Sequence, residues 1–213
     1  MLPPYLDQLD SERKEVFKKL GRFSKSFTLA GGTAIMLQIG HRMSFDFDCF
    51  GSQKLSDSLP RKVRDVLGKF IYLKLRSPEQ ITFHTEKGIE VTFVYHPYKP
   101  LKKPIETDSI AFFHLDDLAA NKAYTVGRRG VWRDYVDLFF LLKWRLYTLE
   151  HLTALAEKKF AGEFSDKLFL QQLTYFDDIT VVDTEFLKES YTPSEIKAFL
   201  EREVEEYVRK ILG

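Results

Sequence analysis

Two aspartates lie two residues apart in an aromatic run, Phe45-Asp46-Phe47-Asp48-Cys49-Phe50. If this run is a β-strand, its side chains alternate between two faces, so Asp46 and Asp48 point the same way. Neighbouring carboxylates repel each other, and a hard divalent cation between them removes that repulsion. The spacing therefore predicts a Mg²⁺ or Mn²⁺ site on Asp46 and Asp48. The alternative is an ordinary exposed strand face.

A glycine pair precedes this run and offers the complementary chemistry. Gly31-Gly32 allows backbone to approach a ligand closely, and a following helix presents unpaired N–H groups to an anion. Thr33 adds a hydroxyl group to the same turn. The order strand, Gly-Gly, short helix and Asp-x-Asp strand would place a phosphate cradle beside a metal site, where bound ions can clamp the oxygens of a phosphoryl displacement. Taken alone, a glycine pair before a helix also fits a simple turn.

The elements that must position these residues differ between the two halves of the chain. Apolar spacing predicts helices at 5–20, 33–39 and 59–70, and strands at 27–30, 45–50, 72–75, 80–85 and 89–95. From about Asp116 the pattern is helical, and Thr192-Pro193-Ser194-Glu195 predicts a capping box that starts the last helix. The sequence thus favours an α+β protein, with a mixed sheet and helices in residues 1–108 and a helical bundle in residues 109–213.

Composition limits the class of protein. The chain has 213 residues, a formal net charge of +1 and a single cysteine, Cys49. One cysteine excludes an internal disulfide and fits a reducing compartment. No apolar run approaches the roughly 20 residues of a membrane span, and the acidic N-terminus is unlike a signal peptide. We therefore expect a cytoplasmic protein with no membrane partner.

Three blocks of sequence, in this order, resemble one known family. They are LAGGTAIMLQIGHRMSFDFDCF, LAANKAYTVGRRGVWRDYVDLFFLL and LTYFDDIT. The first is similar to the signature of the AbiEii-type nucleotidyltransferase-like toxins, within the DNA polymerase β-like nucleotidyltransferase superfamily. The second resembles the Lys-x-x-Ala segment and the Arg-Asp-x-x-Asp helix of that family. The resemblance implies a nucleotidyltransferase-like N-terminal domain and a helical domain that closes the active-site cleft.

The resemblance also implies a role for each matching residue. Nucleotide phosphates would be held by Gly31, Gly32 and Thr33, and divalent metal by Asp46 and Asp48, with Ser44 one alternate position earlier on that face. Lys122 would contact the triphosphate. Two further catalytic acids would line the cleft from the helical side, Asp134 and Asp137, and two arginines would be supporting charges, Arg42 and Arg133. Lys122 and the 133–137 group lie on consecutive predicted helices and can converge, although a structural salt-bridged face is an alternative.

One position departs from the superfamily pattern. A third carboxylate usually lies on a later strand, and the aligned strand here is Ile89-Glu90-Val91-Thr92-Phe93-Val94-Tyr95. The acid would fall at Thr92, whose hydroxyl is a poor metal ligand and base. Glu90 lies on the same face and is a possible substitute ligand, or it faces solvent. Without a third acid, the site could bind nucleotide and metal yet turn the nucleotide over slowly or not at all.

Basic residues gather in two parts of the first half. They are Arg61, Lys62, Arg64, Lys69, Lys74 and Arg76, followed later by Lys99, Lys102 and Lys103. Such a group is typical of a surface for nucleic-acid phosphates, and equally of a solvated helix face.

The preferred hypothesis is a metal-dependent enzyme that moves a nucleoside monophosphate from an NTP to an acceptor. By resemblance the acceptor is an RNA end, such as the tRNA 3′ end, and the enzyme is the toxin of a toxin–antitoxin or phage-defence pair with a cognate antitoxin. One alternative is a nucleotide-binding or regulatory module that has lost turnover. Another is an enzyme of the same chemistry that modifies a protein hydroxyl or a small molecule.

Overall fold

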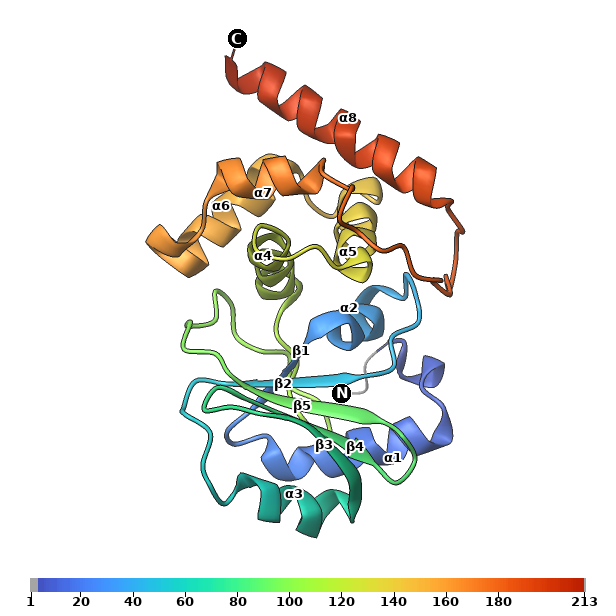
Figure 1. The fold of residues 1–213 in the computed structure, drawn as a ribbon, viewed down its shortest axis with the longest axis vertical. Helices are drawn as coiled ribbons and strands as arrows, with labels where there is room; N and C mark the ends of the chain where they lie inside the picture. The colour runs from blue at the N-terminus through green and yellow to red at the C-terminus, as the bar shows by residue number, and fades with distance from the viewer. Residues whose placement is uncertain (1–3, 213) are drawn as a thin grey trace. The chain divides into compact units, whose positions relative to one another are not determined.

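The computed structural model describes residues 4–212, and for residues 70–76 it describes the backbone alone. The chain divides into two compact units between His114 and Leu115. Figure 1 shows a sheet with helices in the N-terminal unit and helices alone in the C-terminal unit. The α+β class expected from the sequence is confirmed.

The N-terminal unit is built on a sheet that, within the described residues, has five strands in the order β1-β2-β5-β4-β3. The strands are β1 (Thr28–Ala30), β2 (Phe47–Gly51), β3 (Phe70–Arg76), β4 (Gln80–Thr85) and β5 (Glu90–Tyr95). β2 and β5 run parallel, and the other neighbours are antiparallel. The expected mixed sheet is present, although β2 begins at Phe47 rather than at Phe45.

The helices of this unit are α1 (Ser11–Leu20), α2 (Gly31–Ile39) and α3 (Leu59–Leu67). α1 begins after Asp10, whose carboxylate accepts a hydrogen bond of 2.8 Å from the backbone N–H of Arg13. This cap explains why the helix starts well after residue 5. α2 ends at Gly40, where φ is +62° and the left-handed conformation favours glycine.

The two faces of the sheet carry different helices. Figure 1 shows α2 against one face and α1 and α3 against the other. The Phe23 ring lies 5.0 Å from the Phe93 ring of β5, and Lys62 of α3 lies 4.9 Å over the same Phe23 ring. Because side chains alternate along a strand, Phe93 points away from the face of Thr92. α3 therefore covers the face opposite to that of Thr92.

The unit boundary follows from a short segment that returns to the sheet. Ile105 and Phe112 exchange backbone hydrogen bonds of 2.8 and 2.9 Å, and the N–H of Leu29 donates to the carbonyl of Ala111 at 2.8 Å. These contacts attach the segment to β1. The N-terminal unit accordingly continues past residue 108, where the sequence places the boundary, to His114.

Every named secondary-structure element in the described part of the C-terminal unit is a helix. They are α4 (Leu115–Val126), α5 (Trp132–Lys143), α6 (Leu149–Phe160), α7 (Asp166–Leu173) and α8 (Pro193–Leu212), with a 3₁₀ turn at Ala161–Glu163. The core centres on α5, whose residues 134–142 are all buried. At the start of α8, the N–H of Thr192 donates to Glu195 at 2.7 Å and the N–H of Glu195 donates to the Thr192 hydroxyl at 3.3 Å. The capping box is confirmed.

None of the helices in residues 4–212 combines the length and the apolar character needed to cross a membrane.

Candidate active site

The glycine turn between β1 and α2 lies directly against the Asp48 carboxylate. Ala30 pairs with Asp48 in the antiparallel register of β1 and β2. Gly31 has a φ of +68°, and a Cβ added there would lie 2.0 Å from Asp48 Oδ2. Only glycine fits this conformation and this approach. The carboxylate is thereby placed at the N-terminus of α2, where the helix dipole stabilises negative charge.

The second glycine faces a cation and a hydroxyl. A Cβ on Gly32 would lie 2.7 Å from Arg42 Nη2 and 2.9 Å from Ser44 Oγ. Arg42 is buried, with Nη1 donating to the carbonyl of Met43 at 2.9 Å. The turn thus brings together the Asp48 carboxylate, the Arg42 guanidinium and the Ser44 hydroxyl. A guanidinium fork matches phosphate oxygens, so the group can take part in phosphate binding.

The hydroxyl group of Thr33 links α2 to the loop that carries Ser44 and Asp46. It is 1% exposed, and its hydroxyl donates to the carbonyl of Asp46 and lies 3.0 Å from Ser44 Oγ. These two contacts fix that loop to α2. The expected role of Thr33 as a direct phosphate ligand stays a prediction, and its hydroxyl proton is already donated within the protein.

Asp46 and Asp48 occupy different backbone settings. Asp48 lies within β2, where Phe47 and Cys49 are buried and Asp48 and Phe50 are partly exposed. Asp46 lies just before the strand, in the loop that Thr33 fixes. Phe45 is 37% exposed and packs against Arg13, so the expected strand alternation does not reach it. Both residues are partly exposed.

The strand beside Asp48 presents a threonine at the matching position. Thr92 of β5 pairs with Asp48 in the parallel register and with Thr82 of β4 on its other side. The Thr92 and Thr82 hydroxyls lie 3.1 Å apart and are buried. Glu90, the predicted alternative ligand, forms a contact of 3.0 Å with His84 Nε2. Within the described residues, no three His, Cys, Asp or Glu side chains form a group able to hold a metal ion.

In the C-terminal unit, the predicted convergence of Lys122 with the 133–137 group is present. Lys122 Nζ lies 2.5 Å from Asp134 Oδ1 and 2.6 Å from Asp137 Oδ2, and all three side chains are buried. Asp134 Oδ2 is buried with no hydrogen-bond partner. Arg133 is exposed on the same helix. The cluster of Lys122, Asp134 and Asp137 has one more carboxylate than ammonium groups, so a phosphate must compete with two acids for Lys122.

Sequence reasoning missed a second buried ion pair in this unit. Lys159 of α6 lies 2.7 Å from Asp117 of α4, and both side chains are 0% exposed. Burial lowers the pKa of Lys159, and its contacts with Asp117 oppose that shift. The pair fastens α6 to the first turn of α4. The two residues are far apart in the chain and no local spacing connects them.

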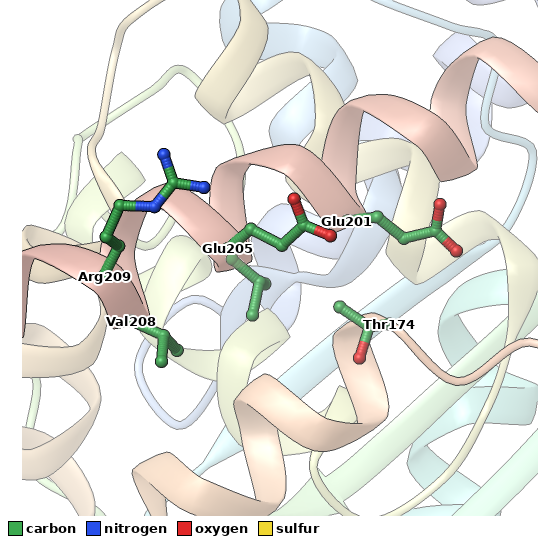
Figure 2. Close-up of a pocket in the computed structure, with 6 residues that line it drawn as sticks. Thr174, Glu201, Glu205, Val208 and Arg209 are labelled. Carbon is green, nitrogen blue, oxygen red and sulfur yellow. The ribbon is translucent and has the colours of Figure 1, made fainter. Parts of the chain in front are cut away.

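A hollow in the C-terminal unit lies between α8 and the end of α7. Figure 2 shows Glu201, Glu205, Val208 and Arg209 on α8, with Thr174 beside them. None of the residues predicted from the sequence to form the active site lines this hollow.

One protein-family model matches sequence in both units. The model for the nucleotidyl transferase AbiEii toxin of type IV toxin–antitoxin systems matches residues 18–210. The chain belongs to the AbiEii family. An uncharacterized protein of Aquifex aeolicus, aq_aa25, is 31% identical over 211 residues, with 94% of this chain and 98% of that protein covered.

Solved structures share the AbiEii fold at low sequence identity. MenT4, a nucleotidyltransferase toxin of Mycobacterium tuberculosis, has a TM-score of 0.63 and 15% identity, with 94% of this chain and 82% of MenT4 covered. JHP933 from Helicobacter pylori has a TM-score of 0.56 and 18% identity, with 99% and 94% covered. The nucleotidyltransferase fold and the AbiEii family together support an enzyme.

Replacing Gly31 by alanine tests whether the turn positions Asp48. We expect Gly31→Ala to displace the Asp48 carboxylate, lower the melting temperature and remove nucleotide binding, because both the backbone and the carboxylate must move. Gly88→Ala is the matched control, since Gly88 also has a positive φ, +73°, but nothing lies within 4 Å of an added Cβ. The control should show only the backbone strain of about 1–2 kcal/mol. Equal effects of the two substitutions on nucleotide binding would refute the positioning role.

Proposed function

We propose that this AbiEii protein is a metal-dependent nucleotidyltransferase that moves a nucleoside monophosphate from an NTP to an acceptor. The observation that carries the proposal is the glycine turn, where a carboxylate, a guanidinium and a hydroxyl meet at the N-terminus of α2. Helix N-termini bind phosphate through unpaired N–H groups. In this proposal Gly31 and Gly32 hold the triphosphate, with Arg42 and Ser44 beside it.

The side chains present fit a divalent cation. Mg²⁺ usually binds one or two protein carboxylates together with substrate phosphates, and Asp46 and Asp48 are two partly exposed carboxylates on one loop and strand. When bound, Mg²⁺ or Mn²⁺ would supply charge neutralisation at the triphosphate. Asp46 and Asp48 would otherwise repel the phosphates, so their presence beside the cradle is consistent with a cation-dependent site.

The proposed reaction is an in-line displacement at the α-phosphorus. The oxygen of the acceptor hydroxyl forms a bond to the α-phosphorus, the bond to the bridging oxygen breaks, and pyrophosphate leaves. The hydroxyl proton passes to solvent. The acceptor proposed from the family resemblance is an RNA end such as the tRNA 3′ end. The protein would act in the cytoplasm as a toxin restrained by a cognate antitoxin.

The helical unit contributes a second set of proposed catalytic residues. We propose that Lys122 contacts the triphosphate and that Asp134 and Asp137 set the position of its ammonium group. The buried contacts of 2.5 and 2.6 Å support the positioning part of this proposal. Lys122→Ala should therefore weaken NTP binding, whereas substitution of the exposed Arg133 should have a smaller effect.

The experiment that tests the proposed function is an acceptor screen. The purified protein is incubated with Mg²⁺ and each of the four labelled NTPs, in the presence of total RNA or total protein. We expect one nucleotide to label an RNA band, and we expect no labelling by Asp48→Asn. If a protein is labelled instead of RNA, the acceptor is a protein and the RNA proposal is wrong. Tight NTP binding with no labelled product would favour a nucleotide-binding module without transfer activity.

That second candidate, a nucleotide-binding module with weak turnover, is favoured by one observation. The residue paired with Asp48 on β5 is Thr92, and we propose that it stands where the superfamily has its third carboxylate. A neutral hydroxyl neither completes a metal shell strongly nor accepts the attacking proton near pH 7. Glu90 is already in contact with His84, so it is an unfavourable replacement.

Thr92→Asp separates the two candidates. If turnover is limited by the missing acid, the substitution should raise the transfer rate at least about tenfold, the scale of a single general-base contribution being about 10²–10⁴. Thr82→Asp is the matched control, because Thr82 is equally buried but lies one strand further from Asp48. If the parent enzyme already transfers nucleotide rapidly and Thr92→Asp does not raise its transfer rate, the third acid is not required.

A further inference from the structure

The segment that follows β5 combines aromatic rings, lysines and prolines. It reads His96-Pro97-Tyr98-Lys99-Pro100-Leu101-Lys102-Lys103-Pro104 and contains no acidic residue. Its first residue is fixed to the sheet, since the His96 N–H donates to the Gly51 carbonyl at the end of β2 at 2.7 Å. We call residues 96–104 the aromatic–lysine loop.

The rings of this loop continue the row of side chains that contains Asp48. Phe50 lies two residues after Asp48 on the same partly exposed face of β2. Its ring is 4.8 Å from the His96 ring, which in turn is 5.0 Å from the Tyr98 ring. The ring of the buried Phe113 also packs against the group, 6.2 Å from the His96 ring and 6.4 Å from the Phe50 ring. An aromatic row therefore leads from the predicted metal site into the loop.

The charged residues of the loop follow these rings in the sequence. Lys99, Lys102 and Lys103 are exposed, and Tyr98 is partly exposed. Three prolines fix part of the backbone, which reduces the conformational entropy that a binding event must remove. Stacking rings beside a positive backbone surface are the two features that single-stranded nucleic-acid sites combine.

The other basic group predicted from the sequence is on the wrong side of the sheet. Arg61, Lys62 and Arg64 belong to α3, which covers the face opposite to that of Thr92 and Asp48. Figure 1 shows α3 and α2 on opposite faces. The side chains of Lys74 and Arg76 lie outside the described residues. The aromatic–lysine loop is thus joined to the face of Asp48, through Phe50, and α3 is not.

We propose that the aromatic–lysine loop holds the single-stranded end of a nucleic-acid acceptor. The terminal base stacks on the partly exposed ring of Tyr98, and the three lysines contact the phosphates of the adjoining nucleotides. The His96 ring, which also packs against Phe50 and Phe113, supports the Tyr98 ring. The row through Phe50 then directs the terminal hydroxyl toward Asp48. This inference rests on the proposed function, because it supplies the acceptor for nucleotide transfer.

The test measures binding of a fluorescently labelled single-stranded RNA to the full chain by anisotropy, over a series of salt concentrations. Lys99→Ala/Lys102→Ala/Lys103→Ala should weaken binding at least about tenfold and reduce the salt slope by about 2, since each phosphate contact on a single strand contributes about 0.7. Arg61→Ala/Lys62→Ala/Arg64→Ala removes the same charge from α3 and should change binding less than twofold. Equal losses in the two triple variants would overturn the proposal.

A pair of substitutions at Tyr98 tests stacking apart from charge. Tyr98→Leu should weaken RNA binding about tenfold with an unchanged salt slope, and Tyr98→Phe should restore it, because stacking requires a ring face. No difference between Tyr98→Leu and Tyr98→Phe would contradict the stacking role. Double-stranded RNA and single-stranded DNA serve as comparison probes, and tighter binding of the duplex would also contradict it.

The two proposals fail in different ways. RNA binding that depends on the loop, without any nucleotide transfer, would remove the proposed enzymatic function and leave the binding surface intact. If nucleotide transfer to RNA is unaffected by the loop variants, the proposed RNA-binding role of the loop is wrong and the proposed enzymatic function stands.

Discussion

Replacing Asp48 by asparagine is expected to lower nucleotide transfer by about a thousandfold or more while the protein stays folded. Metal-assisted charge stabilisation at a phosphoryl group contributes several kcal/mol, and each 1.36 kcal/mol is a factor of ten in rate. The amide keeps the size of the side chain beside Gly31 but removes the charge that a divalent cation requires. Isothermal titration with and without Mg²⁺ should show that the variant loses magnesium-dependent NTP binding.

Asp65→Asn is the control for this substitution, since Asp65 is an exposed carboxylate on α3. It should leave binding, transfer and melting temperature unchanged. Asp46→Asn should behave like Asp48→Asn, because both carboxylates are assigned to the same cation. If Asp48→Asn binds Mg²⁺ and NTP as tightly as the parent, the metal assignment is wrong.

The second large effect concerns stability rather than chemistry. Lys159→Met should destabilise the helical unit by about 3–5 kcal/mol, because it leaves the carboxylate of Asp117 buried without its cation. Both side chains are 0% exposed and 2.7 Å apart. Chemical denaturation followed by circular dichroism measures the loss directly.

A double variant shows whether the loss comes from burying the Asp117 carboxylate without the Lys159 ammonium group. Lys159→Met/Asp117→Leu replaces the pair by apolar side chains and should recover most of the stability. Lys210→Met breaks the exposed pair between Lys210 and Glu150, which lie 2.6 Å apart, and should cause no measurable change. A Lys159→Met variant as stable as the parent would show that the pair does not hold α6 to α4.

Local signals predicted much of this fold. The alternation in Phe47–Gly51 depends only on neighbouring residues, and so does the capping box at Thr192 and Glu195, and both are present. The glycine pair was predicted as a phosphate cradle, which stays a prediction; the structure shows that Gly31 has a positive φ and lies directly against the Asp48 carboxylate. The extent of β2 was overestimated because Thr33, distant in sequence, takes the carbonyl of Asp46 as its acceptor.

Contacts between residues far apart in the chain could not be predicted from the sequence. Thr92 could be aligned with the position of a third acid, but its register opposite Asp48 depends on strands separated by α3, β3 and β4. The contact of Lys159 with Asp117 joins two helices whose spacing in the chain carries no periodic signal. The extension of the N-terminal unit to His114 likewise depends on the return of Phe112 to β1.

The most direct test of the central claim compares two labels on one nucleotide. The parent protein is incubated with Mg²⁺, RNA and an NTP labelled at either the α- or the γ-phosphate. If the glycine turn, Asp46 and Asp48 form a nucleotidyltransferase site, the α-label enters the RNA and the γ-label leaves as pyrophosphate. Transfer of the γ-label, or free inorganic phosphate without labelled RNA, would contradict this account.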